Sequence, residues 1–129
     1  MQDHVSEATL MSLENQAYAL LSDRSVAMAT PIVTKKFATN DNRLIYVTQC
    51  SIAESAVPKL RIQTFERIAG GVMETSYALY SDRRFERTDN PMIFTERKVK
   101  PELAPPVAIS EAEAQQLLAL IAHLATLEG

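Results

Sequence analysis

The sequence has few of the residues on which several classes of function depend. Among 129 residues there is one cysteine, Cys50, together with two histidines, three glycines and no tryptophan. One cysteine cannot form an internal disulfide, and a cysteine-based zinc site would need other ligands. Because the only glycines are Gly70, Gly71 and Gly129, the chain also has no glycine-rich loop of the kind that binds phosphate groups. Disulfide scaffolds, ordinary zinc modules and the usual nucleotide-binding motifs are therefore excluded.

Motifs for catalysis are missing as well. His4 and His123 lie near opposite ends of the sequence, so no HExxH or Cys-His spacing occurs. Cys50 has neither a base nor a cation beside it, which favours a small buried side chain over a nucleophile. His123 falls within an apolar segment, which favours a packing or interface role. We expect no catalytic residue, no metal and no cofactor, with an active site assembled from distant residues as the enzymatic alternative.

The length and composition are those of one globular domain over residues 1–129. Hydrophobic residues make up 47% of the chain and charged residues 22%, which is enough to bury a single core. The first ten residues lack the pattern of a signal peptide, and the longest apolar stretch, LLALIAHLATL, is interrupted by His123 and Thr126. We therefore expect a cytoplasmic protein.

Two segments have the periodicity of helices, one near each end of the chain. Leucine and alanine recur at helical spacing over residues 6–22. Over residues 110–127, Ser110 and Glu113 form a capping-box pattern ahead of regularly spaced leucines. The prolines of residues 101–108 are incompatible with a helix interior or a central strand. The sequence thus predicts two helices, with an extended connector ahead of the second.

The middle of the chain is rich in β-branched and aromatic residues of alternating polarity, which predicts strands within residues 25–99. An Asn-Asp-Asn run at residues 40–42 predicts a hairpin turn, whose register stays open because two- and three-residue loops give comparable patterns. TDNP at residues 88–91 predicts a break between two short strands. With these turns, strands are expected near residues 31–38, 43–51, 83–88 and 92–99.

The clearest hairpin is predicted at Gly70-Gly71, a dipeptide that suits a two-residue turn. If these glycines form the loop, paired residue numbers sum to about 141, and Arg67 lies opposite Glu74. Apolar and charged side chains then separate onto two faces, except for Glu66, which falls on the apolar face and requires an edge position or a bulge. We expect an α+β domain, with an antiparallel sheet of about five or six strands and both helices packed on one face.

The charged residues are unevenly distributed. All 13 lysines and arginines lie between Arg24 and Lys100 together with eight acids, so this region has a net charge of +5. The flanking segments contain the other eight acids and no base, a net charge of −8. One interpretation is structural: acids favour helix N-termini, and bases protect exposed strands. The other is functional, with the bases gathered on one face of the sheet.

In the functional interpretation, a basic sheet face carries aromatic side chains beside arginines. Phe-Glu-Arg occurs at residues 65–67 and 85–87, and alternation along a strand places the phenylalanine and the arginine on the same face. Such a face could bind an acidic protein segment, a phosphorylated ligand or nucleic acid. The residues predicted to bind a partner are Lys59, Arg61, Phe65, Arg67, Tyr80, Arg84 and Arg87.

The C-terminal helix is apolar around much of its circumference, which requires cover on two sides. The core of the domain covers one side. The other side is covered either by the N-terminal helix or by a second copy of the protein, and both alternatives are kept. In the second case the homodimer interface would contain Leu117, Leu120, Ile121 and Leu124.

These features favour a small non-catalytic protein-binding module of the adaptor, chaperone or inhibitor type. It would act through the basic sheet face, the apolar C-terminal helix or both, and we expect a homodimer. The partner is expected to be another protein, with an acidic segment as a candidate, and no membrane is expected to take part. Nucleic-acid binding by the same face is the second hypothesis, and an unrecognised enzyme is the third.

Overall fold

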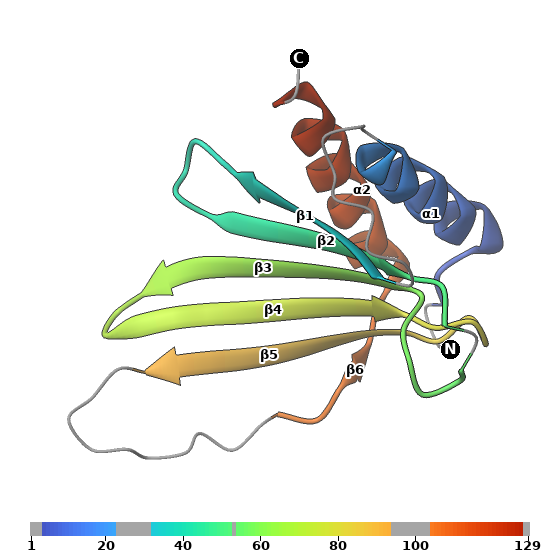
Figure 1. Cartoon of the computed structure of the whole chain (residues 1–129). Helices are drawn as coiled ribbons and strands as arrows, with labels where there is room; N and C mark the ends of the chain where they lie inside the picture. Colours follow the sequence, from blue (N-terminus) through green and yellow to red (C-terminus); the bar gives the residue numbers. More distant parts are fainter. Residues whose placement is uncertain (1–3, 23–31, 53, 94–103, 128–129) are drawn as a thin grey trace.

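The computed structural model describes residues 4–22, 32–52, 54–93 and 104–127. Six strands form one antiparallel sheet whose order in space follows the chain, from β1 at one edge to β6 at the other. Both helices lie on the same face of this sheet (Figure 1). The elements are α1 (Glu7–Leu21), β1 (Ile32–Ala38), β2 (Leu44–Cys50), β3 (Leu60–Ile68), β4 (Gly71–Leu79), β5 (Phe85–Ile93), β6 (Val107–Ala108) and α2 (Glu111–Thr126). The predicted α+β fold is therefore confirmed.

Both helices begin where the sequence predicts. The hydroxyl of Ser6 accepts a hydrogen bond from the backbone N–H of Thr9 at 3.2 Å, and the hydroxyl of Ser110 accepts one from Glu113 at the same distance. Each hydroxyl satisfies one of the N–H groups that a helix N-terminus leaves without a partner. Local capping thus determines where both helices start.

The core lies between the helices and the sheet. Successive side chains of a strand point to opposite faces, so every second residue of the central strands enters this layer. Leu13 and Leu124 of the helices and Ile45 and Leu79 of the sheet have no exposed surface. Full burial of such a side chain contributes about 1.5–3 kcal/mol to the free energy of unfolding. The remaining alternate residues point to the face that the helices leave open.

The β3–β4 hairpin turns one residue earlier than predicted. Its loop consists of Ala69 and Gly70, and because Ile68 pairs with Gly71, paired residue numbers sum to 139 rather than 141. Gly70 has the positive φ, 76°, that such a turn requires. Gly71 belongs to β4, where an added Cβ would collide with the Met92 carbonyl of β5. The second glycine therefore allows two strands to approach closely instead of forming the loop.

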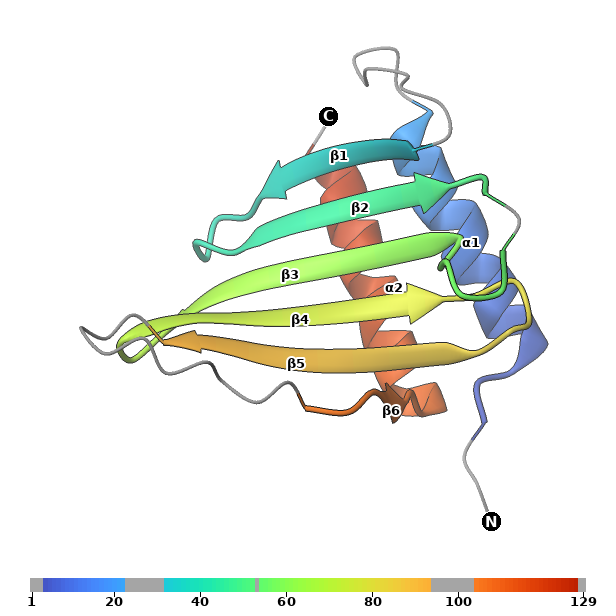
Figure 2. The same cartoon turned by 60° about the horizontal axis from the view of Figure 1, so that its bottom comes forward.

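The change of register keeps each side chain on its predicted face. The sum of paired residue numbers changes by two, and side chains alternate between the faces with a period of two. The predicted pair of Arg67 with Glu74 is wrong, since Arg67 lies opposite Val72. Glu66 is exposed, although neither an edge position nor a bulge relieves it. This end of the β3–β4 hairpin extends beyond both helices (Figure 2).

TDNP does not break the chain. A single strand, β5, runs through it and contains most of the strand predicted at residues 83–88 and the first two residues of the strand predicted at 92–99. Proline lacks the backbone N–H that a residue in a central strand donates to a neighbouring strand. In the described part of the chain, β6 pairs with β5 only at Glu86 and Arg87, so β5 is an edge strand at Pro91. A strand at the edge of a sheet can contain a proline, although in the sequence this proline indicates a turn.

The proline-rich connector predicted at residues 101–108 is described from residue 104 onwards. Residues 104–106 are irregular, and Val107–Ala108 form β6. Residues 94–103, which include most of the strand predicted at 92–99, lie outside the described residues.

Ion pairs join α1 to the sheet. The Glu14 carboxylate contacts Arg83 Nη1 at 2.5 Å and Lys59 Nζ at 2.9 Å, and Arg83 also contacts Glu7 at 2.6 Å. Burial is the largest influence on Glu14 and opposes its ionisation, yet the hydrogen bonds and charges of Lys59 and Arg83 together hold its pKa below the usual value. Arg83 has a φ of 74°, in the left-handed region that residues other than glycine adopt less often.

The second helix makes an equivalent contact. The Glu113 carboxylate accepts a hydrogen bond from Arg87 of β5, and this bond is the first cause of the raised pKa of Arg87. Arg87 Nε also lies 3.3 Å from Asp89. Acids of the helices thus pair with bases of the strand region, in β5 and in the segments next to β3 and β5. The structural interpretation of the charge distribution accounts for these contacts.

Glu111 links the two helix N-termini. One carboxylate oxygen accepts from the Ser6 backbone N–H at 2.8 Å, and the other accepts from the Thr9 hydroxyl at 2.7 Å and from Gln115 at 2.8 Å. The backbone hydrogen bond from Ser6, followed by those of the two side chains, lowers the pKa of Glu111 to about 2. An acid of α2 therefore caps the start of α1.

Replacing Glu14 by glutamine removes the charge that Lys59 and Arg83 share while keeping the shape of the side chain. We expect the free energy of unfolding to fall by about 1 kcal/mol, because these partly screened ion pairs are lost. Urea unfolding followed by circular dichroism measures the change. Glu54→Gln is the matched control, since the Glu54 carboxylate has no partner among the described residues. Equal stability of both variants would contradict this role of Glu14.

The low pKa of Glu111 predicts how stability depends on pH. Its folded pKa, about 2, is below the ordinary value of 4.5, so the contribution to stability is present above pH 4.5 and is lost as the pH falls towards 2. Glu111→Gln should be less stable than the parent chain at neutral pH, and the difference should shrink across this window. Thermal unfolding at a series of pH values tests this, and a difference that does not vary with pH would contradict it.

Candidate functional site

One face of the sheet is left uncovered by the helices. In Figure 2 this open face is turned to the viewer, with both helices behind the strands. The strand pairings place its side chains in rows that cross the sheet. One row contains Thr34, Thr48, Arg61, Ala78 and Glu86; the next contains Lys36, Tyr46, Gln63, Ser76 and Thr88; a third contains Ala38, Leu44, Phe65, Glu74 and Asn90. We call this surface the open face.

Two aromatic rings lie in contact on the open face. Tyr46 and Phe65 have ring centroids 5.6 Å apart and an interplanar angle of 87°, an edge-to-face arrangement. Such pairs contribute about 0.5–1.5 kcal/mol beyond the area that they bury. Leu44, in the same row as Phe65, is 39% exposed. The centre of the open face therefore presents apolar surface held in a defined geometry.

Three cations of the open face have no hydrogen-bond or ion-pair partner within the described residues. They are Lys36 of β1 and Arg61 and Arg67 of β3. Other cations differ: Arg43, for example, contacts Asp41 at 2.9 Å. Lys36, Arg61 and Arg67 can therefore bind an anionic group without first breaking an internal ion pair.

The structure brings together only part of the predicted partner-binding set. Arg61, Phe65 and Arg67 share the open face. Lys59 and Arg87 do not, because each pairs with an acid of a helix. Whether these side chains share one face thus depends on how their strands lie in the sheet, and the sequence alone does not determine this.

Tyr80 and Arg84 lie near Arg61 but are already engaged. The Arg84 guanidinium stacks 4.2 Å from the centroid of the Tyr80 ring and contacts Asp82 at 2.8 Å. Arg84 also donates to the Ser55 carbonyl at 2.9 Å. Arg61 and Tyr80 line the same shallow hollow. This pair therefore borders the open face and contributes less free charge than predicted.

An acid on the open face is satisfied by neutral groups. Glu74 accepts hydrogen bonds from Gln63 at 3.1 Å and from Asn90 at 3.2 Å. These amides hold the carboxylate in place without neutralising it. The open face is consequently of mixed charge, with cations on both sides of a fixed acid.

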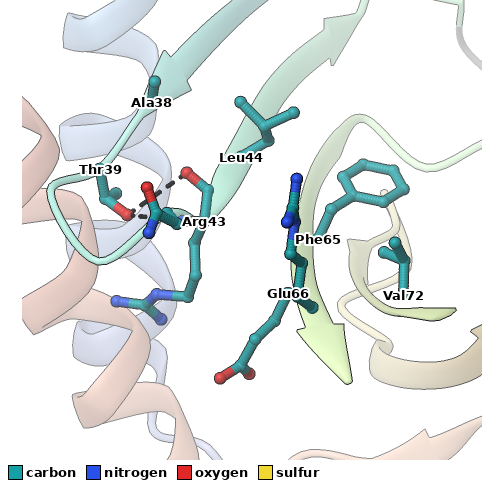
Figure 3. Close-up of a pocket in the computed structure, with 9 residues that line it drawn as sticks. Ala38, Thr39, Arg43, Leu44, Phe65, Glu66 and Val72 are labelled. Carbon is teal, nitrogen blue, oxygen red and sulfur yellow. Dashed lines mark hydrogen bonds between the residues drawn. The ribbon is translucent and has the colours of Figure 1, made fainter. Parts of the chain in front are cut away.

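A hollow of about 430 Å³ lies at the end of the open face that extends beyond the helices, between two hairpin tips (Figure 3). Its apolar walls come from four strands or strand ends, and polar residues form the rim. The lining residues are Ala38, Thr39, Asn42, Arg43, Leu44, Phe65, Glu66, Arg67 and Val72. We call this the hairpin hollow.

The loop that forms one side of the hairpin hollow has a defined shape. The Thr39 N–H donates to the Arg43 carbonyl at 3.0 Å, and the Asn42 N–H donates to the Thr39 carbonyl at 3.2 Å. Asn42 has a φ of 64°, a conformation that asparagine tolerates well. This hairpin turn is the one predicted from the Asn-Asp-Asn run.

The predicted homodimer residues belong mainly to the core of the chain itself. Leu117, Ile121 and Leu124 are almost fully buried against α1 and the sheet, and Leu120 is partly buried. The first helix thus covers the side for which a second copy was the alternative. Whether the protein is a homodimer stays a prediction, and of the four predicted residues Leu120 is the one that is only partly buried.

The residues with metal-binding or nucleophilic chemistry do not converge. His4 and His123 are exposed, and Cys50 is a buried free thiol. Among the described residues there is no group of three His, Cys, Asp or Glu side chains arranged to hold a metal ion. Within the same part of the chain, no helix is both long and apolar enough to cross a membrane.

No protein-family model, curated protein or solved structure matches this chain. Its function is therefore inferred from its own geometry.

Sequence reasoning missed the hairpin hollow and the contribution of Leu44 and Tyr46. The strand alternation that exposes them was visible, but two- and three-residue loops gave comparable patterns for this hairpin. The hydrogen bond from the Thr39 N–H to the Arg43 carbonyl fixes the register and leaves three residues, 40–42, in the loop.

Proposed function

We propose that the protein is a non-catalytic protein-binding module of the adaptor, chaperone or inhibitor type, and that it binds its partner on the open face. One observation carries the proposal: among the described residues, three cations without a hydrogen-bond or ion-pair partner lie around the half-buried Tyr46 and Phe65 and the exposed Leu44, on the sheet face that the two helices leave open. The C-terminal helix has no part in this proposal, since its apolar side is in the core.

The composition of the open face suits a protein interface. Protein-binding surfaces are rich in tyrosine, phenylalanine and arginine, and their strongest contacts involve such residues in packed surroundings. Tyr46, Phe65, Arg61 and Arg67 supply these residue types on adjacent strands. The β sheet holds them in fixed positions, which lowers the entropy cost of binding.

The same face disfavours a polyanion as the main partner. Glu74 and Glu86 lie among the cations, and a nucleic-acid backbone would approach both carboxylates. The whole chain has a formal charge of −3, which weakens long-range attraction of phosphates. A protein segment can instead place its acids next to the cations and its neutral side chains next to Glu74.

Nucleic-acid binding is the second candidate, and the contact of Tyr46 with Phe65 favours it. Aromatic side chains on an open sheet can stack unpaired bases, and nearby arginines contact phosphates. The edge-to-face geometry leaves only part of each ring free for stacking.

Neutralising two of the cations tests the proposed surface. We expect the double substitution Arg61→Ala and Arg67→Ala to weaken partner capture about tenfold or more while leaving thermal stability unchanged. Capture by the tagged full chain from a nuclease-treated lysate of its source, with quantitative mass spectrometry, measures the loss. The control carries Gln16→Glu and Gln116→Glu, exposed helix positions that give the same change of net charge. Undiminished capture by the arginine variant would place the interface elsewhere.

The nucleic-acid alternative makes a separate prediction. If it holds, capture disappears after nuclease treatment, affinity for a single-stranded oligonucleotide falls steeply with salt, and Phe65→Ala reduces that affinity. Fluorescence anisotropy at two salt concentrations measures the affinities of the parent chain and of Phe65→Ala, and capture with and without nuclease measures the first effect. We expect no such salt-dependent binding; its appearance would replace the protein partner by a nucleic acid.

A further inference from the structure

We propose that the hairpin hollow receives one apolar side chain from an extended acidic segment of the partner, with carboxylates on either side of it contacting Lys36 and Arg67. This inference rests on the proposed function, because it names the chemistry of the segment that the open face binds. The partner segment would have the pattern acid, any residue, apolar residue, any residue, acid.

The apolar requirement follows from the walls of the hollow. Ala38, Leu44, Phe65 and Val72 come from four consecutive strands, β1 to β4, so the sheet hydrogen bonds hold them in position. Leu44 keeps 39% of its surface exposed. An apolar side chain seated here would remove that surface from water together with its own.

The acidic requirement follows from the charges beside the walls. Arg67 lines the hollow and has no partner among the described residues. Glu66 and Arg43 also line it, but both side chains point away from Leu44 and Phe65 (Figure 3), and Arg43 is paired with Asp41. Of the charged residues that line the hollow, the one on the open-face side is therefore positive, while Glu74, opposite Phe65, lies outside the lining.

The spacing of the two cations specifies the pattern. Lys36 precedes Ala38 by two residues on β1, and Arg67 follows Phe65 by two residues on β3, so the cations lie on opposite sides of the row that forms the hollow. Two residues of an extended chain span about 6.6 Å and return to the same face. A segment with acids two residues before and after its apolar residue matches this arrangement.

Peptide titration tests the inference directly. The probe is a nine-residue peptide with a central phenylalanine, an aspartate two residues to each side, and serine elsewhere. We expect it to shift the amide signals of residues 36–46 and 63–74 in nitrogen-15 spectra of the full chain. Replacing the phenylalanine by serine, or both aspartates by lysine, should weaken binding about tenfold. Equal binding of the control peptides, shifts elsewhere, or no binding would overturn the inference.

Two variants separate this inference from the proposed function. Ala38→Phe fills the hollow and Arg67→Gln removes one cation, so each should weaken the peptide about fivefold or more, whereas Gln16→Glu on α1 should not. If Ala38→Phe does not fold, Arg67→Gln still decides the outcome. If partner capture is lost with the double substitution Arg61→Ala and Arg67→Ala but retained with Ala38→Phe, the inference about the hairpin hollow is overturned. The open face then remains the proposed binding surface. Capture retained by the double arginine variant and by Ala38→Phe alike would overturn the proposed function.

Discussion

The packing of two apolar helices on a single face of the sheet is the constraint on which the rest of the structure depends. Leu13 of α1, Leu124 of α2 and Ile45 of β2 meet in one layer without exposed surface. Once this layer is formed, strand alternation directs every other side chain to the opposite face. The chain has no further described element to cover that face. Its exposure is therefore a consequence of how the core is made.

The same packing explains most of the uneven charge distribution. Neither helix contains a lysine or an arginine, and their acids meet bases at the strands or next to them: Glu14 contacts Lys59, just before β3, and Arg83, between β4 and β5, and Glu113 contacts Arg87 of β5. These contacts lie at the border of the core, where they orient the helices on the sheet more than they stabilise it. The functional interpretation of the charge distribution then applies only to the cations that pair with no acid of a helix.

The features that sequence could predict are those determined locally. Helix boundaries follow from Ser6 and Ser110, and the two faces of the central hairpin follow from alternation. The errors all involve a neighbour that is distant in sequence. Gly71 must accommodate β5, and Pro91 lies where no strand of the described residues pairs on the outer side of β5. The hairpin hollow depends on how two hairpin tips lie relative to each other, and no local sequence pattern predicts that arrangement.

The acidic helical layer and the cations of the open face also make the molecule electrically asymmetric across its thickness. Such a molecule orients in the field of an approaching anion before any contact is made, so an acidic partner would meet the open face first and the helices would repel it. The Debye length at physiological ionic strength is about 8 Å, comparable with the spacing of packed layers. The rate of association would consequently depend on ionic strength more than the lifetime of the complex would.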